Sequence, residues 1–306
     1  MQSLVSALIS EISKVVHGKE QQVKMALACL FSQGHLLIED QPGMGKTTLA
    51  QSLAKVLGLE YARVQFTSDL LPADIIGVSV FDQTHTRFDF HPGPIFTQLL
   101  LADEINRTSP KTQSALLEAM EERQVTSDGE TRALPNPFFV IATQNPSSQD
   151  GTFPLPESQL DRFLMRISLG YPDAEVERAM LAGEDPRAKM DGLTCKIKPE
   201  QMQQFMVESQ KVQAAPAILD YIQRLIAYTR TSADFAFGIS TRGALSLMRC
   251  ARTWAFMHGR SHIVPEDIQL LLPAVVGHRV RDTADYTGQS GLALIERALE
   301  NVEVVA

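Results

Sequence analysis

The chain has 306 residues, of which 44% are hydrophobic and 21% are charged, so its composition predicts a folded globular protein rather than a disordered one. Its 28 lysines and arginines against 36 aspartates and glutamates give a net charge of −8, which disfavours a general nucleic-acid binder. No apolar run approaches the roughly 18 residues of a membrane span, and the N-terminus shows no signal-peptide pattern. The three cysteines are far apart in the sequence, so we expect buried thiols in a reducing cytoplasm.

Apolar residues at helical spacing predict a helix over residues 4–16 and a second helix over about 22–31. The apolar stretch 35–38 reads as a strand, and a third helical pattern over 49–57 ends at Gly58. A glycine-containing loop lies between them. Strand, glycine loop and helix in this order are the context that a phosphate-binding loop needs.

That loop reads Glu39-Asp40-Gln41-Pro42-Gly43-Met44-Gly45-Lys46-Thr47-Thr48. Its glycines let successive N–H groups point at one anion, and the following helix adds its positive N-terminal end. Lys46 would reach the phosphates and the Thr47 hydroxyl would hold Mg²⁺. Asp40 stands where the general pattern G-x-x-x-x-G-K-[ST] has its first glycine. The alternative is an ordinary Gly-Lys-Thr turn at a helix start.

A second strand is predicted over residues 61–66, and residues 79–81 and 87–90 are predicted to pair as a small hairpin. Two interpretations of this hairpin stay open at this point. It is either a plain surface hairpin or an inserted loop that grips a partner.

Two buried strands end in polar side chains. Residues 98–104 end in Asp103 and Glu104, where Asp103 would hold the Mg²⁺ shell and Glu104 would polarise the attacking water. The alternative is a pair of solvated carboxylates. Residues 138–146 form the other strand, and its Asn145 either binds a water or a γ-phosphate or caps the turn before Pro146.

The other predicted elements complete two domains. Ser109 and Pro110 predict the start of a helix over 111–122, and a hairpin over 124–134 turns at Asp128-Gly129. A last strand over 164–169 precedes a domain boundary, which gives an α/β domain over 1–170 and a helical domain over 171–306. Helices of this second domain are expected from 199, over 216–230, from 240 to 259, from 265 and over 291–301, with no convincing strand.

The phosphate loop, residues 101–104, residues 141–146 and residues 160–163, followed by a helical lid, together resemble an AAA+ ATPase. Several longer stretches resemble the MoxR family in particular, namely 66–77, 102–107, 113–122, 143–146 and 151–157. That family tolerates an aspartate at the position of Asp40. The resemblance covers nearly the whole chain, and it implies an AAA+ P-loop NTPase core, a parallel sheet flanked by helices, with a small all-α lid.

The resemblance also implies roles for individual residues. Lys46, Thr47 and Asp103 match the phosphate and Mg²⁺ ligands, and Glu104 matches the catalytic base. Asn145 matches sensor 1, and Arg162 matches the arginine finger that reaches a neighbouring subunit's ATP. Arg242 matches the sensor 2 arginine of the lid. Thr241 stands where a proline usually precedes that last arginine. The nucleotide-binding set comprises His17 and Gly18 near the adenine, with Gly43, Met44, Gly45, Lys46, Thr47 and Thr48. The segments 78–91 and 124–134 match the helix-2 insert and the pre-sensor-1 hairpin.

The function implied is that of a MoxR-type ATPase that forms a ring, expected to be a hexamer, and uses ATP and Mg²⁺ to remodel protein clients or to assist their assembly. Such proteins commonly work with a partner that carries a von Willebrand factor A domain. One alternative is a motor that translocates nucleic acid, which the acidic composition disfavours. Another is a nucleotide-binding module without hydrolysis, which the presence of Glu104, Asn145 and Arg162 disfavours.

The hairpin around residues 81–90 is expected to grip the client through its phenylalanines. The alternative is that these rings pack on the neighbouring subunit. Neither nucleic-acid binding nor membrane insertion is expected.

Overall fold

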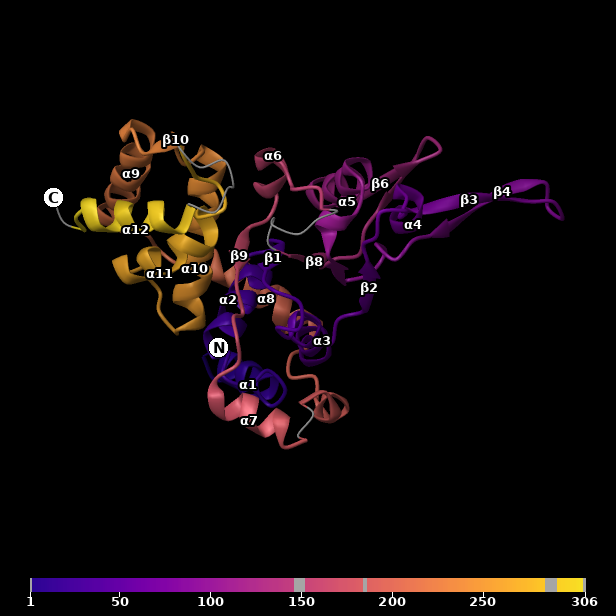
Figure 1. Cartoon of the computed structure of the whole chain (residues 1–306), viewed down its shortest axis with the longest axis horizontal. Helices are drawn as coiled ribbons and strands as arrows, with labels where there is room; N and C mark the ends of the chain where they lie inside the picture. Colours follow the sequence, from indigo (N-terminus) through magenta and orange to yellow (C-terminus); the bar gives the residue numbers. More distant parts are fainter. Residues whose placement is uncertain (1, 146–151, 184–185, 284–290, 305–306) are drawn as a thin grey trace.

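The computed structural model describes residues 2–145, 152–183, 186–283 and 291–304, and a five-stranded sheet lies at its centre (Figure 1). Pro146 and Gly151, which belong to the family-like stretches, lie outside the described residues. The strand order is β2-β5-β8-β1-β9, and every neighbouring pair is parallel, as predicted. The strands are β1 (Leu36–Glu39), β2 (Tyr61–Gln65), β5 (Leu99–Asp103), β8 (Phe139–Gln144) and β9 (Met165–Ile167).

Helices cover both faces of this sheet because its central strands are apolar on both faces. Leu99 and Leu101 pack into one buried cluster, while Leu100 and Ala102 pack into the other. The first cluster includes residues of α1 (Gln2–Ser13), α2 (Glu20–Phe31) and α3 (Lys46–Leu57), and the second includes residues of α4 (Pro72–Ile76) and α5 (Pro110–Glu122). The sheet is therefore the middle layer of three.

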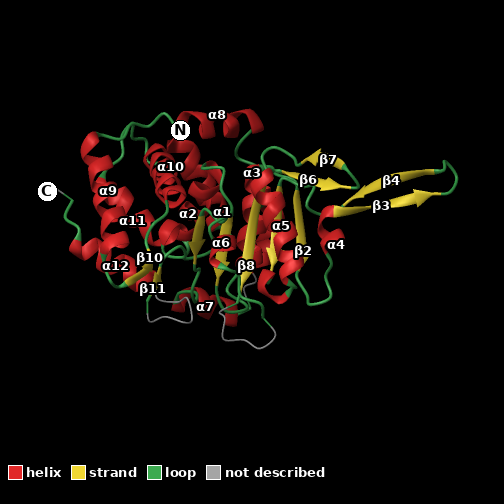
Figure 2. Ribbon diagram, turned by 90° about the horizontal axis from the view of Figure 1, so that it is seen from above, coloured by secondary structure: helices red, strands yellow, loops and turns green. Residues whose placement is uncertain are grey.

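Two hairpins extend from the α4 and α5 side of the sheet, away from the C-terminal helices (Figures 1 and 2). The longer one joins β3 (Gly77–Asp82) to β4 (Arg87–Pro92), and the shorter one joins β6 (Gln124–Ser127) to β7 (Glu130–Ala133). The shorter hairpin turns at Asp128 and Gly129, which have φ angles of 55° and 80°. Both angles are left-handed, as a two-residue hairpin turn requires.

The C-terminal half is mostly helical, and it also contains a small sheet. Strands β10 (Phe235–Phe237) and β11 (Arg281–Asp282) pair antiparallel, so the prediction of no strand in this region was wrong. They are too short to show an alternating pattern in the sequence. The other elements are η1 (Ile105–Arg107), α6 (Glu157–Leu160), α7 (Ala174–Leu181), η2 (Pro186–Gly192), α8 (Pro199–Ser209), α9 (Pro216–Thr231), α10 (Thr241–Met257), α11 (Pro265–Val276) and α12 (Gly291–Asn301). Within the described residues, no helix is both long and apolar enough to cross a membrane.

The buried cluster around α1, α2 and α3 continues into the C-terminal helices. The ring of Phe31 on α2 lies 4.4 Å from that of Phe205 on α8, measured between centroids. Residues of α10, α11 and α12 belong to the same cluster. The domain boundary after residue 170 thus stays a prediction, since α8 packs against the helices that precede it.

The three cysteines do not share one environment. Cys29 and Cys250 are buried free thiols, and burial raises the pKa of both, that of Cys250 to about 12. Cys195 is exposed, so the expectation of a buried thiol was wrong at this position. It lies in the segment between η2 and α8, which runs over the surface.

A buried carboxylate connects α1 to this same surface segment. The side chain of Glu11 accepts from Lys14 at 2.8 Å and from the Thr194 backbone N–H at 3.1 Å, and it pairs with Lys196 at 3.2 Å. These partners, Lys14 first, lower the pKa of Glu11 from 4.5 to about 2. A carboxylate with a depressed folded-state pKa stabilises the fold above its unfolded pKa, and this contribution disappears as the pH falls through the folded value.

We expect Glu11→Gln to lower the melting temperature by a few degrees near neutral pH, because it removes the charge that these groups bind. The difference from wild type should shrink as the pH falls from 4.5 toward 2. Thermal unfolding across this range measures it. Glu20→Gln, which breaks an exposed ion pair with Lys24, is the control and should change little. An equal deficit of Glu11→Gln at all pH values would contradict the expectation.

Candidate functional site

The predicted site residues Asp103, Glu104 and Asn145 lie where neighbouring strands of the sheet end. Strands β5, β8 and β1 lie side by side and run parallel, so their carboxyl ends share one edge of the sheet. Asp103 is the last residue of β5 and Glu104 follows it, Asn145 follows β8, and Asp40 follows β1 at the start of the glycine loop. Ligands of open α/β sheets bind at this edge.

The glycine loop has the shape of an anion cradle. Gly43 and Gly45 have φ angles of 88° and 85°, in the left-handed region that side chains rarely adopt. A Cβ built on either glycine meets no atom of the described structure within 4 Å, so open space adjoins the loop backbone. Gly45 is also the residue before α3, so the loop opens onto a helix N-terminus. These features fit a bound phosphate chain.

Lys46 is buried at the first position of α3 and lies between two strand ends. Its Nζ donates to the Asp40 carbonyl oxygen at 2.7 Å and to Asn145 Oδ1 at 3.3 Å. Burial lowers the pKa of Lys46, and the charges of Asp40, Asp103 and Glu104 act in the opposite direction. The ammonium is therefore already beside the loop that a phosphate would occupy.

The Asp103 carboxylate is held on both oxygens. Thr143 Oγ1 donates to Asp103 Oδ1 at 2.6 Å, and Arg63 pairs with Oδ2 at 2.7 Å. Carboxylate and hydroxyl oxygens are the hard ligands that Mg²⁺ binds in proteins, so Asp103 and Thr47 fit that ion by the chemistry of their donors.

Glu104 is fixed by its backbone and by three neighbouring side chains. Its φ of 58° is left-handed, and its N–H donates to Thr143 Oγ1 at 2.8 Å. Asn145 Nδ2 donates to Oε1 at 3.0 Å, Gln65 Nε2 donates to Oε2 at 2.9 Å, and Arg107 pairs with Oε2 at 3.1 Å. The carboxylate thus lies beside Asn145 at the end of the sheet, where the sequence placed both.

Sequence reasoning missed Arg63, Gln65 and Arg107 as partners of Asp103 and Glu104. A signal for two of them was present, because Arg63 and Gln65 alternate along β2 and therefore share one face. That face could be assigned to Asp103 and Glu104 only after β2 was known to pair with β5, in the register that places Gln65 opposite Asp103. Arg107 is close enough in sequence to reach Glu104 through η1.

A cavity of about 250 Å³ adjoins the glycine loop. Its walls come from the loop, from the segment before α2 and from the segment that follows β9. Gly18 has a φ of 69°, and a Cβ there would lie 2.6 Å from an oxygen of Asp173, so a turn against α7 requires this glycine. The lining residues are Val15, Val16, His17, Lys19, Gly43, Met44, Gly45, Thr48, Leu169, Gly170, Pro172, Val176 and Met180.

Arg162 and Arg242 meet at one carboxylate on α5. Arg162 pairs with Glu121 at 3.1 Å, and Arg242 pairs with the other oxygen of Glu121 at 2.5 Å and with Asp161 at 3.6 Å. The hydrogen bond from Arg242 lowers the pKa of Glu121 and raises that of Arg242. Among the residues that the structure describes, neither arginine lines the 250 Å³ cavity. The structure thus brings Arg242 and Arg162 to the same carboxylate.

Two family models match the chain. Residues 35–165 match the ATPase family associated with various cellular activities (AAA), and residues 227–298 match the AAA lid domain. The first match contains the glycine loop and all three strand ends of the site. The second contains Arg242.

Relatives similar to the chain span nearly its full length. YeaC of Bacillus subtilis is 42% identical over 98% of this chain and 95% of that protein. Chaperone MoxR1 of Mycobacterium tuberculosis is 38% identical over 96% of this chain and 80% of that protein. Protein MoxR of Methylorubrum extorquens is 32% identical over 88% of this chain and 85% of that protein. A crystal structure of a protein from Cytophaga hutchinsonii matches with a TM-score of 0.87 and 36% identity, over 99% of this chain and 95% of that one.

Proposed function

Because the chain belongs to the MoxR family of AAA+ ATPases and hydrolyses ATP, we propose that it does so in an oligomeric ring, expected to be a hexamer, that remodels protein clients or assists their assembly. The name of the Mycobacterium tuberculosis relative, a chaperone, supports the client part of this proposal. A partner with a von Willebrand factor A domain and a cytoplasmic location belong to the same proposal. The buried free thiols Cys29 and Cys250 suit a reducing compartment.

One observation carries the ring proposal, namely the placement of Arg162 and Arg242. Both contact Glu121 on α5, whereas Lys46, Asn145 and Glu104 are joined to one another by hydrogen bonds at the sheet edge. Their exposed fractions, 28% and 56% of the side chain, leave both guanidinium groups able to meet another molecule. We therefore assign both arginines to the ATP of a neighbouring subunit.

The residues at the sheet edge receive the roles that the resemblance implies. Lys46 would move its donated hydrogen bonds from Asp40 and Asn145 to the β- and γ-phosphates. Mg²⁺, held by Thr47 and Asp103, would neutralise phosphate charge when bound. Glu104 would accept a proton from the attacking water, and the side chain of Asn145, already hydrogen-bonded to Glu104, would orient that water or the γ-phosphate.

The 250 Å³ cavity is our candidate for the base of the nucleotide. His17 and Met44 line it together with apolar residues, and Gly43, Gly45 and Thr48 connect it to the phosphate side. Gly18 contributes the turn that places His17. An aromatic base buried against apolar side chains at one end, with phosphates in a glycine loop at the other, matches the two halves of this site.

The client would be gripped by the tip of the β3–β4 hairpin. Phe81 and Phe88 face each other across the strands, with ring centroids 5.2 Å apart, and are 47% and 70% exposed. Phe90 does not belong to this surface, because it packs on Phe96 and lies 3.9 Å beneath the Arg132 guanidinium. An exposed pair of aromatic rings suits protein contacts better than a nucleic-acid groove, which would need cations around it.

Two side-chain contacts join the β3–β4 hairpin to the β6–β7 hairpin. Arg132 of β7 covers Phe90 of β4, and Ser79 Oγ of β3 donates to Asp128 Oδ2 at the β6–β7 turn, at 2.5 Å. Arg132 is therefore engaged by Phe90 and by its own neighbour Glu130. On the β3–β4 hairpin, Arg87 pairs with Asp89 at 2.8 Å, so the described arginines of both hairpins have carboxylate partners, which weighs against the nucleic-acid motor.

We expect the double variant Phe81→Ala/Phe88→Ala to lose client binding while ring assembly and basal ATPase rate stay near normal, since both rings lie at an exposed hairpin tip. Clients are defined as proteins that co-purify with Glu104→Gln protein in ATP and are identified by mass spectrometry. Client binding of the double variant is then tested on that background, whereas its ATPase rate and its assembly, followed by sedimentation, are measured with Glu104 intact.

Phe237→Ala is the matched control, because it removes another exposed phenylalanine on the C-terminal half. It should keep client binding. Loss of assembly in the double variant would support the alternative, in which the rings pack on the neighbouring subunit. Tight, salt-dependent DNA binding by the wild type, with ATPase stimulated by DNA, would refute the protein-client proposal and favour the nucleic-acid motor.

A further inference from the structure

Asp40 occupies the position that is glycine in the general phosphate-loop pattern, and its side chain is buried. The carboxylate accepts three hydrogen bonds, all from consecutive residues that follow β9. Ser168 Oγ donates to Oδ1 at 2.7 Å, the Leu169 N–H donates to Oδ2 at 2.5 Å, and the Gly170 N–H donates to Oδ1 at 3.3 Å. Gly170 has a left-handed φ of 66°, which turns the chain at this point.

These donors belong to the wall of the cavity that we assign to the base. Leu169 and Gly170 line it, and the chain continues into α7, whose Val176 and Met180 line it too. On the opposite side of the same residue, the Asp40 carbonyl accepts the hydrogen bond of Lys46 Nζ. Asp40 thus contacts the base side with its carboxylate and the phosphate side with its backbone.

We propose that Asp40 is a positioning residue that fixes the base-side wall of the nucleotide pocket to the phosphate loop. The proposal rests on the nucleotide site proposed above. Hydrogen bonds to a buried carboxylate are strong, and a glycine at this position would leave the N–H groups of Leu169 and Gly170 without that partner. The segment 168–170 would then be free to move away from the loop, and the base would lose its wall.

The alternative is that Asp40 acts on ATP binding only through its charge. That charge raises the pKa of Lys46, against the effect of burial. The two roles differ in what they do to a ligand without a base. If Asp40 positions the wall, inorganic triphosphate should bind Asp40→Gly about as well as wild type. If Asp40 acts through Lys46, triphosphate and ATP should change together.

The experiment measures binding of ATP and of inorganic triphosphate, each with Mg²⁺, by calorimetry on the full chain. We expect Asp40→Gly to weaken ATP binding about tenfold or more, since each hydrogen bond to a charged group matters on this scale, with triphosphate affinity nearly unchanged. Ser168→Ala, which removes one donor and keeps the charge, should show the same selective loss to a smaller degree. If Asp40→Gly does not fold, the ATP and triphosphate affinities of Ser168→Ala decide between the two roles of Asp40.

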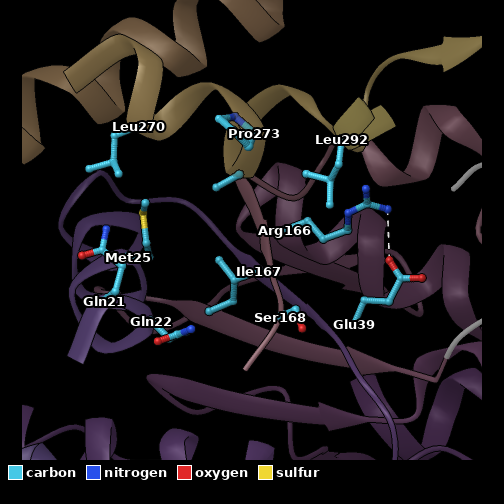
Figure 3. Close-up of a pocket in the computed structure, with 11 residues that line it drawn as sticks. Gln21, Gln22, Met25, Glu39, Arg166, Ile167, Ser168, Leu270, Pro273 and Leu292 are labelled. Atoms are coloured by element: carbon cyan, nitrogen blue, oxygen red, sulfur yellow. Dashed lines mark hydrogen bonds and ion pairs between the residues drawn. The ribbon is translucent and has the colours of Figure 1, made fainter. Parts of the chain in front are cut away.

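Glu39→Gln is the matched control. Glu39 precedes Asp40 and also connects β1 to β9, through an ion pair with Arg166 at 3.0 Å. Figure 3 shows this pair in the wall of a separate cavity of about 440 Å³, bounded by α2, β9, α11 and α12. Glu39 also acts through its charge on Lys46, so Glu39→Gln removes a charge near Lys46 and leaves the Asp40 contacts in place. We expect Glu39→Gln to keep both affinities within about twofold of wild type if those contacts hold the wall.

An unchanged ATP affinity in both Asp40→Gly and Ser168→Ala would overturn the proposal, and so would an equal loss for ATP and triphosphate. These outcomes are distinct from failure of the nucleotide site itself. In that case the wild type would bind neither ligand.

Discussion

Glu104→Gln protein is expected to bind ATP with wild-type affinity and to hydrolyse it about 10²- to 10⁴-fold more slowly, the usual contribution of a general base. Glutamine keeps the side-chain shape, and its amide oxygen can still accept from Asn145 or Gln65, whose donors lie 3.0 Å and 2.9 Å from the carboxylate. It cannot take a proton from water. Asp103, which we assign to Mg²⁺, is left intact with its bonds to Thr143 and Arg63. Single-turnover hydrolysis and equilibrium ATP binding measure the two effects separately.

Two further variants define the limits of this test. Lys46→Ala should abolish ATP binding, because it removes the cation beside the phosphate loop and leaves Asp103 and Glu104 without its charge. Glu118→Gln, an exposed carboxylate on α5, is the control and should change neither binding nor rate. Hydrolysis by Glu104→Gln at the wild-type rate would remove Glu104 from the role of base.

Arg162→Ala protein is expected to lose about 10³-fold in turnover, the scale of an arginine supplied to a phosphoryl-transfer site from a second subunit. Mixing it with Lys46→Ala protein should restore part of the activity. Each Arg162→Ala subunit retains Lys46, and each Lys46→Ala neighbour can supply the missing guanidinium. In a randomly mixed closed ring about a quarter of the interfaces would contain both intact groups.

Arg242→Ala should behave like Arg162→Ala in the same mixing experiment, because both side chains contact Glu121. Arg297→Ala is the control, since its partner Asp234 lies elsewhere in the C-terminal half. Rescue of Arg162→Ala but not of Arg242→Ala would return Arg242 to the nucleotide of its own chain. Full activity in a strictly monomeric sample would rule out catalysis between subunits altogether.

The sheet and most helices could be predicted from the sequence because their signals are local. Strands β5 and β8 are continuous apolar runs that end in polar residues, and α10 begins at Ser240, whose hydroxyl accepts from the Gly243 N–H. Local signals also place Lys46, Asp103, Glu104 and Asn145 at strand and helix ends. That these ends meet at one edge follows from the parallel order of the strands.

What the sequence could not show depends on contacts between distant segments. Arg162 and Arg242 are 80 positions apart in the chain, and no spacing rule brings them to Glu121. The same holds for Asp40, whose departure from the loop pattern has a physical cause only once residues 168–170 are seen against it. Strands β10 and β11 were missed because they exist only through their pairing across the C-terminal half.

Helix α5 connects the two arginines to the hairpins, so movement at the ATPase site could be transmitted along it. Glu121, which holds both arginines, is in its last turn, and β6 begins at Gln124 directly after it. The β6–β7 hairpin is in turn attached to the β3–β4 hairpin through Ser79 and Phe90. If the phosphates of a neighbouring subunit displace these arginines, the displacement would therefore reach the Phe81 and Phe88 rings through α5 and the two hairpins. The motion would pass from one subunit to the next rather than within one subunit.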